Sequence, residues 1–187
     1  MSSNIKIKNL ENNKVSFKEI FFLYQKMVYN LALQYSQNVE DAEEITQDVF
    51  VKISDKFESF KNQSKLKTWI YRIAINQSLD FIKAKNAQKR IFFSSIFRIG
   101  DEKNFYQPVN FDHPGAVLEQ KEDIQEIFKA INKLTAQQKT VIILLKIEGN
   151  SQSETSEIME LSEKAVESLF QRAKKNLEII LTKNKGK

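Results

Sequence analysis

The sequence predicts an all-α protein made of two small helical domains joined by an irregular linker, the second containing a helix-turn-helix. Its 187 residues include only four glycines and two prolines, too few for the many tight turns of an all-β fold. Apolar residues recur at spacings of three and four over long stretches, which is the period of an amphipathic helix. These two observations set the fold class.

Two amphipathic helices are expected near the start of the chain. Between Phe17 and Gln37 one apolar stripe comprises Ile20, Leu23, Tyr24, Met27, Val28, Leu31 and Tyr35. A second stripe comprises Ala42, Ile45, Val49, Phe50 and Ile53. This pattern predicts that the outer side of the second helix carries Asp41, Glu44, Gln47 and Asp48.

Opposite charges are segregated in this part of the chain. Residues 40–58 hold seven acids and two lysines, whereas residues 59–90 hold eight bases and one acid. Glu40, Glu44 and Asp48 are spaced four apart, and each such like-charge pair costs a helix about 0.2–0.5 kcal/mol. The acidic run is either a solubilising surface or a surface for a basic partner, and the basic run beside it favours a polyanion.

A third amphipathic helix is predicted by Leu66, Trp69, Ile70 and Ile73, after the polar segment FKNQSK at 60–65. Its other face carries a polar stripe of Lys65, Thr68, Arg72 and Asn76, with Trp69 and Tyr71 nearby. Cations neutralise phosphates, amides and hydroxyls bind base edges, and aromatic rings stack on unpaired bases. The stripe therefore indicates nucleic-acid binding, although a single aromatic such as Trp69 is more often a core residue.

The segment 88–115 has no helical period and holds both prolines and two of the four glycines. We therefore expect domains at 1–90 and 116–187, with a linker at 91–115.

Capping residues set the helices expected in the second domain. After a helical pattern over 117–131, Thr135 begins a helix that Gly149 ends, and Ser151 begins a short helix through Met159. Ser162 then begins a longer helix whose inward residues are Val166, Phe170, Ala173 and Leu177. A short helix, a tight turn and a long helix suggest a helix-turn-helix, but this shape also occurs in interaction proteins.

Three stretches together resemble one protein family. They are NVEDAEEITQDVFVKI, FKNQSKLKTWIYRIAINQSLDFIK and LTAQQKTVIILLKIEGNSQSETSEIMELSEKAVESLFQRAKKNL. In order and spacing they are similar to the two domains of bacterial RNA polymerase sigma factors of the extracytoplasmic-function (ECF) type. The resemblance covers most of residues 15–182.

The resemblance implies a role for each surface. The acidic helix would bind a basic coiled coil of the largest subunits of core RNA polymerase, through Asp41, Glu44, Gln47 and Asp48. The next segment would open and hold the minus-10 promoter element, through Lys61, Asn62, Lys65, Lys67, Thr68, Trp69, Tyr71, Arg72 and Asn76. The last helix would read the minus-35 element in duplex DNA, through Lys164, Glu167, Ser168, Gln171, Arg172 and Lys175.

The chain departs from the family pattern at two informative places. Glu167 and Leu169 stand where many members carry a basic pair, so a base preference cannot be transferred. Glu160 replaces the usual glycine of the turn, and a left-handed conformation there costs a residue with a side chain about 1 kcal/mol. An anti-sigma factor is a further partner that the resemblance implies.

Two other classes of function differ from this one in what they explain. A helix-turn-helix regulator that binds duplex DNA without being a polymerase subunit would leave the acidic face unexplained, and a pure interaction protein would not depend on nucleic acid. The sequence shows no nucleophile–base pair and no phosphate-binding glycine loop, so we expect no catalytic residue. Without cysteine, and with His113 as the one histidine, we expect no metal and no cofactor. No stretch resembles a signal peptide or membrane span, and we expect a cytoplasmic protein without membrane insertion.

Overall fold

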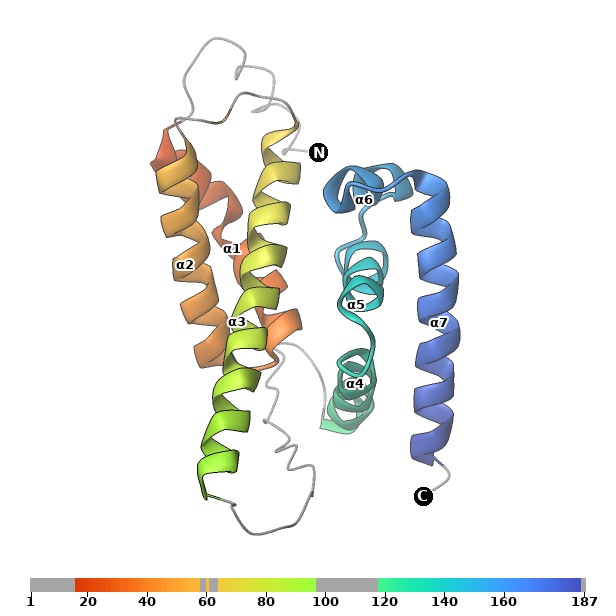
Figure 1. Cartoon of the computed structure of the whole chain (residues 1–187). Helices are drawn as coiled ribbons and strands as arrows, with labels where there is room; N and C mark the ends of the chain where they lie inside the picture. The colour runs from red at the N-terminus through yellow and green to blue at the C-terminus, as the bar shows by residue number, and fades with distance from the viewer. Residues whose placement is uncertain (1–15, 58–59, 61–63, 97–117, 186–187) are drawn as a thin grey trace.

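The computed structural model describes residues 16–57, 60, 64–96 and 118–185, and over these ranges the chain is helical without strands. The helices form two units that lie side by side (Figure 1). The first contains α1 (Phe17–Ser36), α2 (Val39–Phe57) and α3 (Leu66–Ile96). The second contains α4 (Leu118–Ile131), α5 (Ala136–Ile142), the π-helical segment η2 (Ile143–Ile147), α6 (Gln152–Met159) and α7 (Glu163–Lys185). The predicted fold class is confirmed, while linker residues 97–115 and the predicted DNA-binding residues Lys61 and Asn62 lie outside the described ranges.

The core of the first unit follows the apolar stripes. All five apolar residues predicted for α2 are buried, as are Ile20, Val28, Leu31 and Tyr35 of α1. Burying side chains of this size contributes about 1.5–3 kcal/mol each, so these contacts hold α1, α2 and α3 together. Leu23 was expected in the same stripe, but it is 61% exposed, which corrects that prediction. It lies at the edge of the apolar arc, beyond the part of α1 that the neighbouring helices cover.

The third helix is longer than the sequence pattern suggested. α3 continues to Ile96, so residues 91–96 are helical although we expected the linker to begin at 91. Extending an established helix by one residue is far easier than starting one, because each added residue gains a hydrogen bond. The segment IFFSSI also contains neither glycine nor proline, and Gly100 is the first such residue beyond it.

The predicted caps begin the helices of the second unit. The side chain of Thr135 accepts a hydrogen bond from the backbone N–H of Gln138, and Ser162 accepts one from Ala165. Ser151 and Glu154 form a complete capping box, in which each side chain bonds the other's backbone N–H. Such caps satisfy N–H groups that the first helical turn leaves unpaired.

The turn between α6 and α7 adopts the expected left-handed conformation without glycine. Glu160 has a φ of 56° and a ψ of 41°, and the following backbone N–H of Leu161 bonds the carbonyl of Ser156. Besides Glu160, the other residue with a side chain and a positive φ in the described part of the chain is Gln37, at the end of α1. Both residues therefore tolerate a conformation that glycine adopts more easily.

The helix that begins at Thr135 changes its winding before it ends. From Ile143 to Ile147 it is π-helical, and the N–H of Glu148 bonds the carbonyl of Ile143, five residues earlier, at 2.9 Å. Gly149 follows with a φ of 68°, so the chain leaves the helix where the sequence predicted. A π-helical turn is a helix with one additional residue, and such turns are frequent at functional positions.

Candidate nucleic-acid and protein-binding surfaces

The predicted polymerase-binding residues on α2 fall into two groups. Glu44 and Gln47 are exposed, as predicted. Asp41 is largely buried instead, because Lys85 of α3 binds its carboxylate at 2.5 Å. Asp48 is half-buried and accepts a hydrogen bond of 2.7 Å from Gln77, whose own oxygen accepts from Lys52. The expectation of four outward residues is therefore wrong for Asp41 and only partly right for Asp48, since their carboxylates bind polar groups of α3.

The polar stripe predicted on α3 is interrupted. Lys65, Lys67 and Asn76 are exposed, but Thr68 is only 5% exposed and belongs to the packed side of the helix. Trp69 is half-buried and lies against Phe60, with 4.9 Å between ring centroids. Its packing agrees with the core interpretation that the sequence left open.

Tyr71 and Arg72 point at the second unit rather than at solvent. Tyr71 is 2% exposed, and its hydroxyl donates to the carboxylate of Glu148 at 2.9 Å. Arg72 forms an ion pair of 2.8 Å with Glu160 and donates at 2.6 Å to the backbone carbonyl of Glu157. Burial, and then the charge of Glu148, raise the pKa of the Tyr71 hydroxyl, so it remains a hydrogen-bond donor at physiological pH.

Further contacts continue the interface between the two units. Gln34 donates to Glu148 at 2.6 Å, Gln37 donates to the carbonyl of Phe128 at 3.0 Å, and the hydroxyls of Tyr35 and Thr140 lie 2.6 Å apart. The capping contacts of Ser151 lower the pKa of Glu154, and the nearby charges of Lys67 and Lys65 lower it further. The face of α6 toward α3 is thus acidic where α3 is basic.

The outer side of α7 carries every residue predicted to read duplex DNA. Lys164, Glu167, Ser168, Gln171, Arg172 and Lys175 are all exposed. They lie opposite an apolar stripe in which Val166, Leu169 and Ala173 are buried. α7 is on the side of the second unit that faces away from α3 (Figure 1). The arrangement leaves one polar helix face free to enter a groove of DNA.

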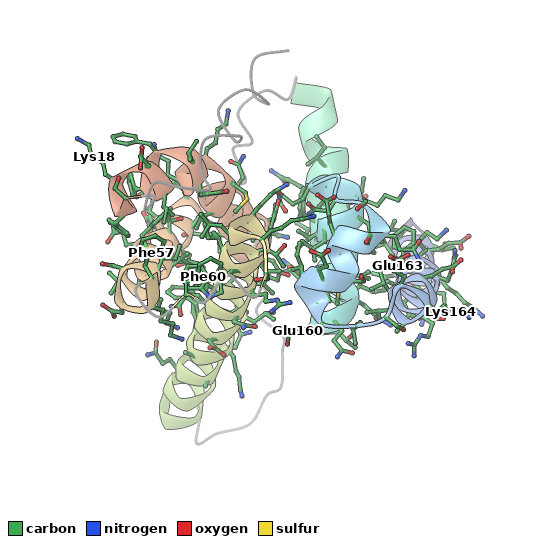
Figure 2. The ribbon with its side chains drawn as sticks, turned by 90° about the horizontal axis from the view of Figure 1, so that it is seen from above. Lys18, Phe57, Phe60, Glu160, Glu163 and Lys164 are labelled. Carbon is green, nitrogen blue, oxygen red and sulfur yellow. The ribbon has the colours of Figure 1, made fainter. Side chains whose placement is uncertain are left out.

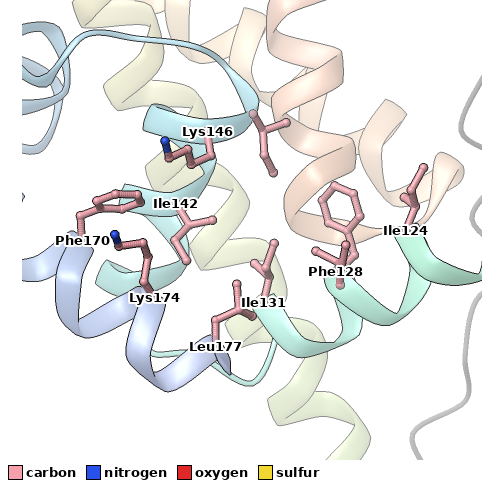
Figure 3. A pocket seen from close by; sticks show the side chains of 10 residues that line it. Ile124, Phe128, Ile131, Ile142, Lys146, Phe170, Lys174 and Leu177 are labelled. Atoms are coloured by element: carbon pink, nitrogen blue, oxygen red, sulfur yellow. The ribbon is translucent and has the colours of Figure 1, made fainter. Parts of the chain in front are cut away.

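A separate apolar groove lies between α4, α5 and α7. It has a volume of about 490 Å³, and its lining includes Ile124, Phe128, Ile131 and Leu177. Figure 3 shows Lys146 and Lys174 beside the ring of Phe170, and their ammonium groups lie 5.3 and 5.1 Å from its centroid. The second unit therefore has an apolar surface with cations at its edge, distinct from the polar face of α7.

Lys139 is the buried cation of the interface. It is 7% exposed, and its ammonium donates to the backbone carbonyl of Tyr35 at 2.9 Å and to the side-chain oxygen of Asn132. It also lies 5.0 Å from the centroid of the Tyr35 ring. Burial lowers the pKa of Lys139 to about 7, because the charged form loses its hydration.

The burial of Lys139 predicts a free energy of unfolding that rises with pH. Lys139 binds a proton with a pKa of about 7 in the folded chain and near its ordinary value of 10.5 when exposed. Between these values the unfolded chain holds more protons, so the free energy of unfolding should increase with pH, by at most about 1.4 kcal/mol per pH unit. Below the folded pKa the lysine is charged in both states and contributes no slope. Denaturant unfolding at several pH values from 7 to 9 measures the effect.

The matched variant is Lys139→Met, which keeps an unbranched apolar side chain and removes the titrating group. Its absolute stability is not the readout, since two acceptors lose their donor. The comparison is the slope with pH, which should be smaller in the variant than in the parent. Equal slopes would contradict the prediction.

Comparisons with known proteins identify the family. Residues 21–88 match the family described as Sigma-70 region 2, and residues 124–177 match Sigma-70, region 4, in the order of the two helical units. The ECF RNA polymerase sigma factor SigW of Bacillus subtilis is 29% identical over 165 residues, which cover 87% of each chain. The ECF RNA polymerase sigma-E factor of Haemophilus influenzae is 28% identical over 90% of this chain and 88% of its own. The chain belongs to the ECF family of RNA polymerase sigma factors.

Solved structures agree with this family assignment. A sigma factor RpoE from Bartonella quintana, in complex with the anti-sigma factor NepR, matches with a TM-score of 0.61 and 26% identity over 89% of this chain and 96% of that one. CnrH, in complex with the cytosolic domain of CnrY, matches with the same TM-score at 21% identity, over 91% and 90% of the two chains, which supports the fold. As a member of this family, the protein is an ECF sigma factor that acts in transcription initiation.

Sequence reasoning missed the residues through which the two units of this sigma factor meet. Glu148, Lys139 and Thr140 contact residues of α1 and α3 that lie 77 to 114 positions away in the chain. No local spacing signals such a contact. The one available hint was Glu160, a charged residue at a turn that favours glycine.

No group of three or more histidine, cysteine, aspartate or glutamate side chains is placed to hold a metal ion in the part of this sigma factor that the structure describes. Among the same residues no helix is both long and apolar enough to cross a membrane.

Proposed function

We propose that this ECF sigma factor binds core RNA polymerase through α2, holds the separated strand of a minus-10 promoter element on α3, and reads a minus-35 element with α7. The observation that carries the proposal is the position of two polar surfaces on a chain that matches sigma regions 2 and 4 in order. One is the exposed face of α2 with Glu44 and Gln47, and the other is the exposed face of α7.

The face of α2 suits a basic protein partner. Glu44 and Gln47 are exposed, and Glu40, one turn before Glu44, is exposed as well. Asp41 and Asp48 add negative charge at the edge of this face although their carboxylates are bound to α3. Like charges this close weaken an isolated helix, so a cationic surface that relieves the repulsion is a favourable partner.

The surface of α3 suits single-stranded DNA. Lys65 and Lys67 are exposed and provide cations for phosphates, and the exposed Asn76 provides an amide. Tyr71 and Arg72 lie on the same helix but contact the second unit, so they would reach DNA only in another arrangement of the two units. In this proposal DNA opening depends on the whole complex, and phosphodiester chemistry belongs to the polymerase rather than to this chain. The protein would accordingly act in the cytoplasm, where core polymerase and promoter DNA are present.

An anti-sigma factor is the third partner in the proposal. The supporting fact is that the solved sigma factor at 26% identity is in complex with one. A cognate anti-sigma protein should reduce the transcription directed by this chain and leave transcription by other sigma factors of the same polymerase unchanged.

Run-off transcription with purified core polymerase tests the proposal. Genomic DNA fragments serve as templates, and the transcripts are sequenced with and without this protein. We expect new transcripts whose start sites share two upstream elements at a fixed spacing. A helix-turn-helix regulator that is not a polymerase subunit would instead bind its duplex alone and yield no start sites with core polymerase alone, which would overturn the proposal.

A further inference from the structure

An aromatic patch at the start of α1 is open to water. It consists of Phe17, Phe21 and Phe22, whose side chains are 38%, 36% and 63% exposed. The ring centroids of Phe17 and Phe21 lie 6.5 and 4.8 Å from that of the buried Phe50 on α2. The ring of Phe22 lies 5.9 Å from that of Phe21, again between centroids. The patch therefore continues the core of the first unit to the surface, along the boundary between α1 and α2.

The described residues of the second unit lie away from this patch. Figure 2 shows Lys18, the residue after Phe17, on the side of the first unit that faces away from the second. The hydrogen bonds of Gln34 and Tyr35 to the second unit lie near the other end of α1. Adjoining exposed aromatic rings mark a surface that another segment or molecule covers.

The chain itself has a segment of matching chemistry next to the patch. Residues 4–10, NIKIKNL, come shortly before α1, and the apolar Ile5 and Ile7 alternate there with Lys6 and Lys8. In an extended conformation, this alternation places the two isoleucines on one side and the two lysines on the other. A segment of this kind can present one row of side chains to each of two neighbouring helices.

The segment is long enough to reach every ring of the patch. An extended chain advances about 3.3 Å per residue, so residues 8–16 span roughly 30 Å. The patch from Phe17 to Phe22 occupies only about 8 Å along the axis of α1. Because the segment is joined to α1, its effective concentration at the patch is on the order of millimolar, and a weak contact is enough to keep it bound.

Charges determine the orientation in which the segment fits. On α1 the exposed Lys18 lies one turn before Phe21 and Phe22, on the same side of the helix. On α2 the exposed Glu43 lies two helical turns before Phe50 and therefore on the same side as that ring. Lysines that face α2 meet an opposite charge, whereas lysines that face α1 would meet Lys18. The isoleucine row then lies on the α1 side, over the aromatic rings.

We propose that residues 4–10 bind as an extended segment along the boundary between α1 and α2, with the two isoleucines on the aromatic patch and the two lysines toward Glu43. The contact forms within one chain and removes the patch from water. It requires neither polymerase nor DNA, so it goes beyond the proposed function and is tested on the free protein.

The test places a photoreactive phenylalanine analogue at Phe22, the most exposed ring of the patch, in the full chain. After irradiation, crosslinked peptides of the monomer are mapped by mass spectrometry, separately from any crosslinked dimer. Ile5→Ser with Ile7→Ser removes the apolar row, and Asn4→Ser with Asn9→Ser is the matched control in the same segment. Binding of the dye ANS measures exposed apolar surface, and circular dichroism shows that each variant is folded.

In the parent and the control we expect crosslinks within one chain to residues 4–10 and little bound ANS. The isoleucine variant should lose these crosslinks and bind more ANS, because serine has little apolar surface to bury on the rings. Equal crosslinking in the isoleucine variant and the parent would show that the segment is only held nearby by its tether, which overturns the proposal. Crosslinks confined to a dimer, or to other parts of the chain, also overturn it, since a second copy or another segment would then cover the patch.

Discussion

Replacing Glu44 and Gln47 by lysine should reduce binding to core polymerase by at least a hundredfold and leave the fold intact. Both side chains are exposed on α2, opposite the buried stripe of Ala42, Ile45 and Val49. Close charge pairs in an interface are worth about 1.5–7 kcal/mol, and here attraction becomes repulsion. The stability of the variant should be equal or slightly higher, because the repulsion between Glu40 and Glu44 is relieved. Co-purification with core polymerase and a thermal melt by circular dichroism provide the two measurements.

The matched control is Glu43→Lys with Ser54→Lys. It changes the net charge by the same amount on the same helix, and both residues are exposed on the flank of the proposed face. The control should keep most of the binding. If both double variants bind core polymerase like the parent, the face of α2 is a solubilising surface and the assignment fails.

Replacing Gln171 and Arg172 by alanine should weaken binding to a duplex with the minus-35 element about 10- to 100-fold. Both are exposed on α7, and a bidentate contact to a base contributes about 1–3 kcal/mol of discrimination. Transcription should fall most at promoters whose minus-10 element is weak. Fluorescence anisotropy with the duplex that run-off mapping defines is the measurement.

Salt dependence and a control variant show which kind of contact is lost. Lys183→Ala removes an exposed cation from the end of α7 and should change affinity little. If Arg172 binds a phosphate rather than a base, its loss should reduce the salt slope by about one and weaken all duplexes alike. Equal binding by the double variant and the parent would remove this face of α7 from the proposed site.

The sequence was informative wherever function or packing depends on local spacing. The apolar stripe of α2 and the caps at Ser151 and Ser162 depend on residues three and four apart, so the pattern alone predicted them. The exposed polar face of α7 was predicted for the same reason.

The prediction was weaker wherever contacts between distant segments of the chain determine which side chains are buried. Leu23 has the right spacing but lies at the edge of the apolar arc, and its side chain is 61% exposed. Thr68 belongs to a polar stripe by spacing and Tyr71 lies beside it, yet both side chains are buried, and Glu148 of the second unit binds Tyr71. The contact with Glu148 spans 77 positions, and no helical period carries that information.

The π-helical segment from Ile143 to Ile147 makes the contact between the two units tolerant of a change in chain length. Because a π turn contains one residue more than the α turn it replaces, removing one residue there would restore α-helical winding. The residues on either side of the segment would keep their phase, so Glu148 would still face Gln34 and Tyr71 while α5 kept its buried face. A single-codon deletion in this segment should therefore leave the contact of Glu148 with α1 and α3 in place. Among relatives, a helix that is one residue shorter at this point would be compatible with the same meeting of the two units.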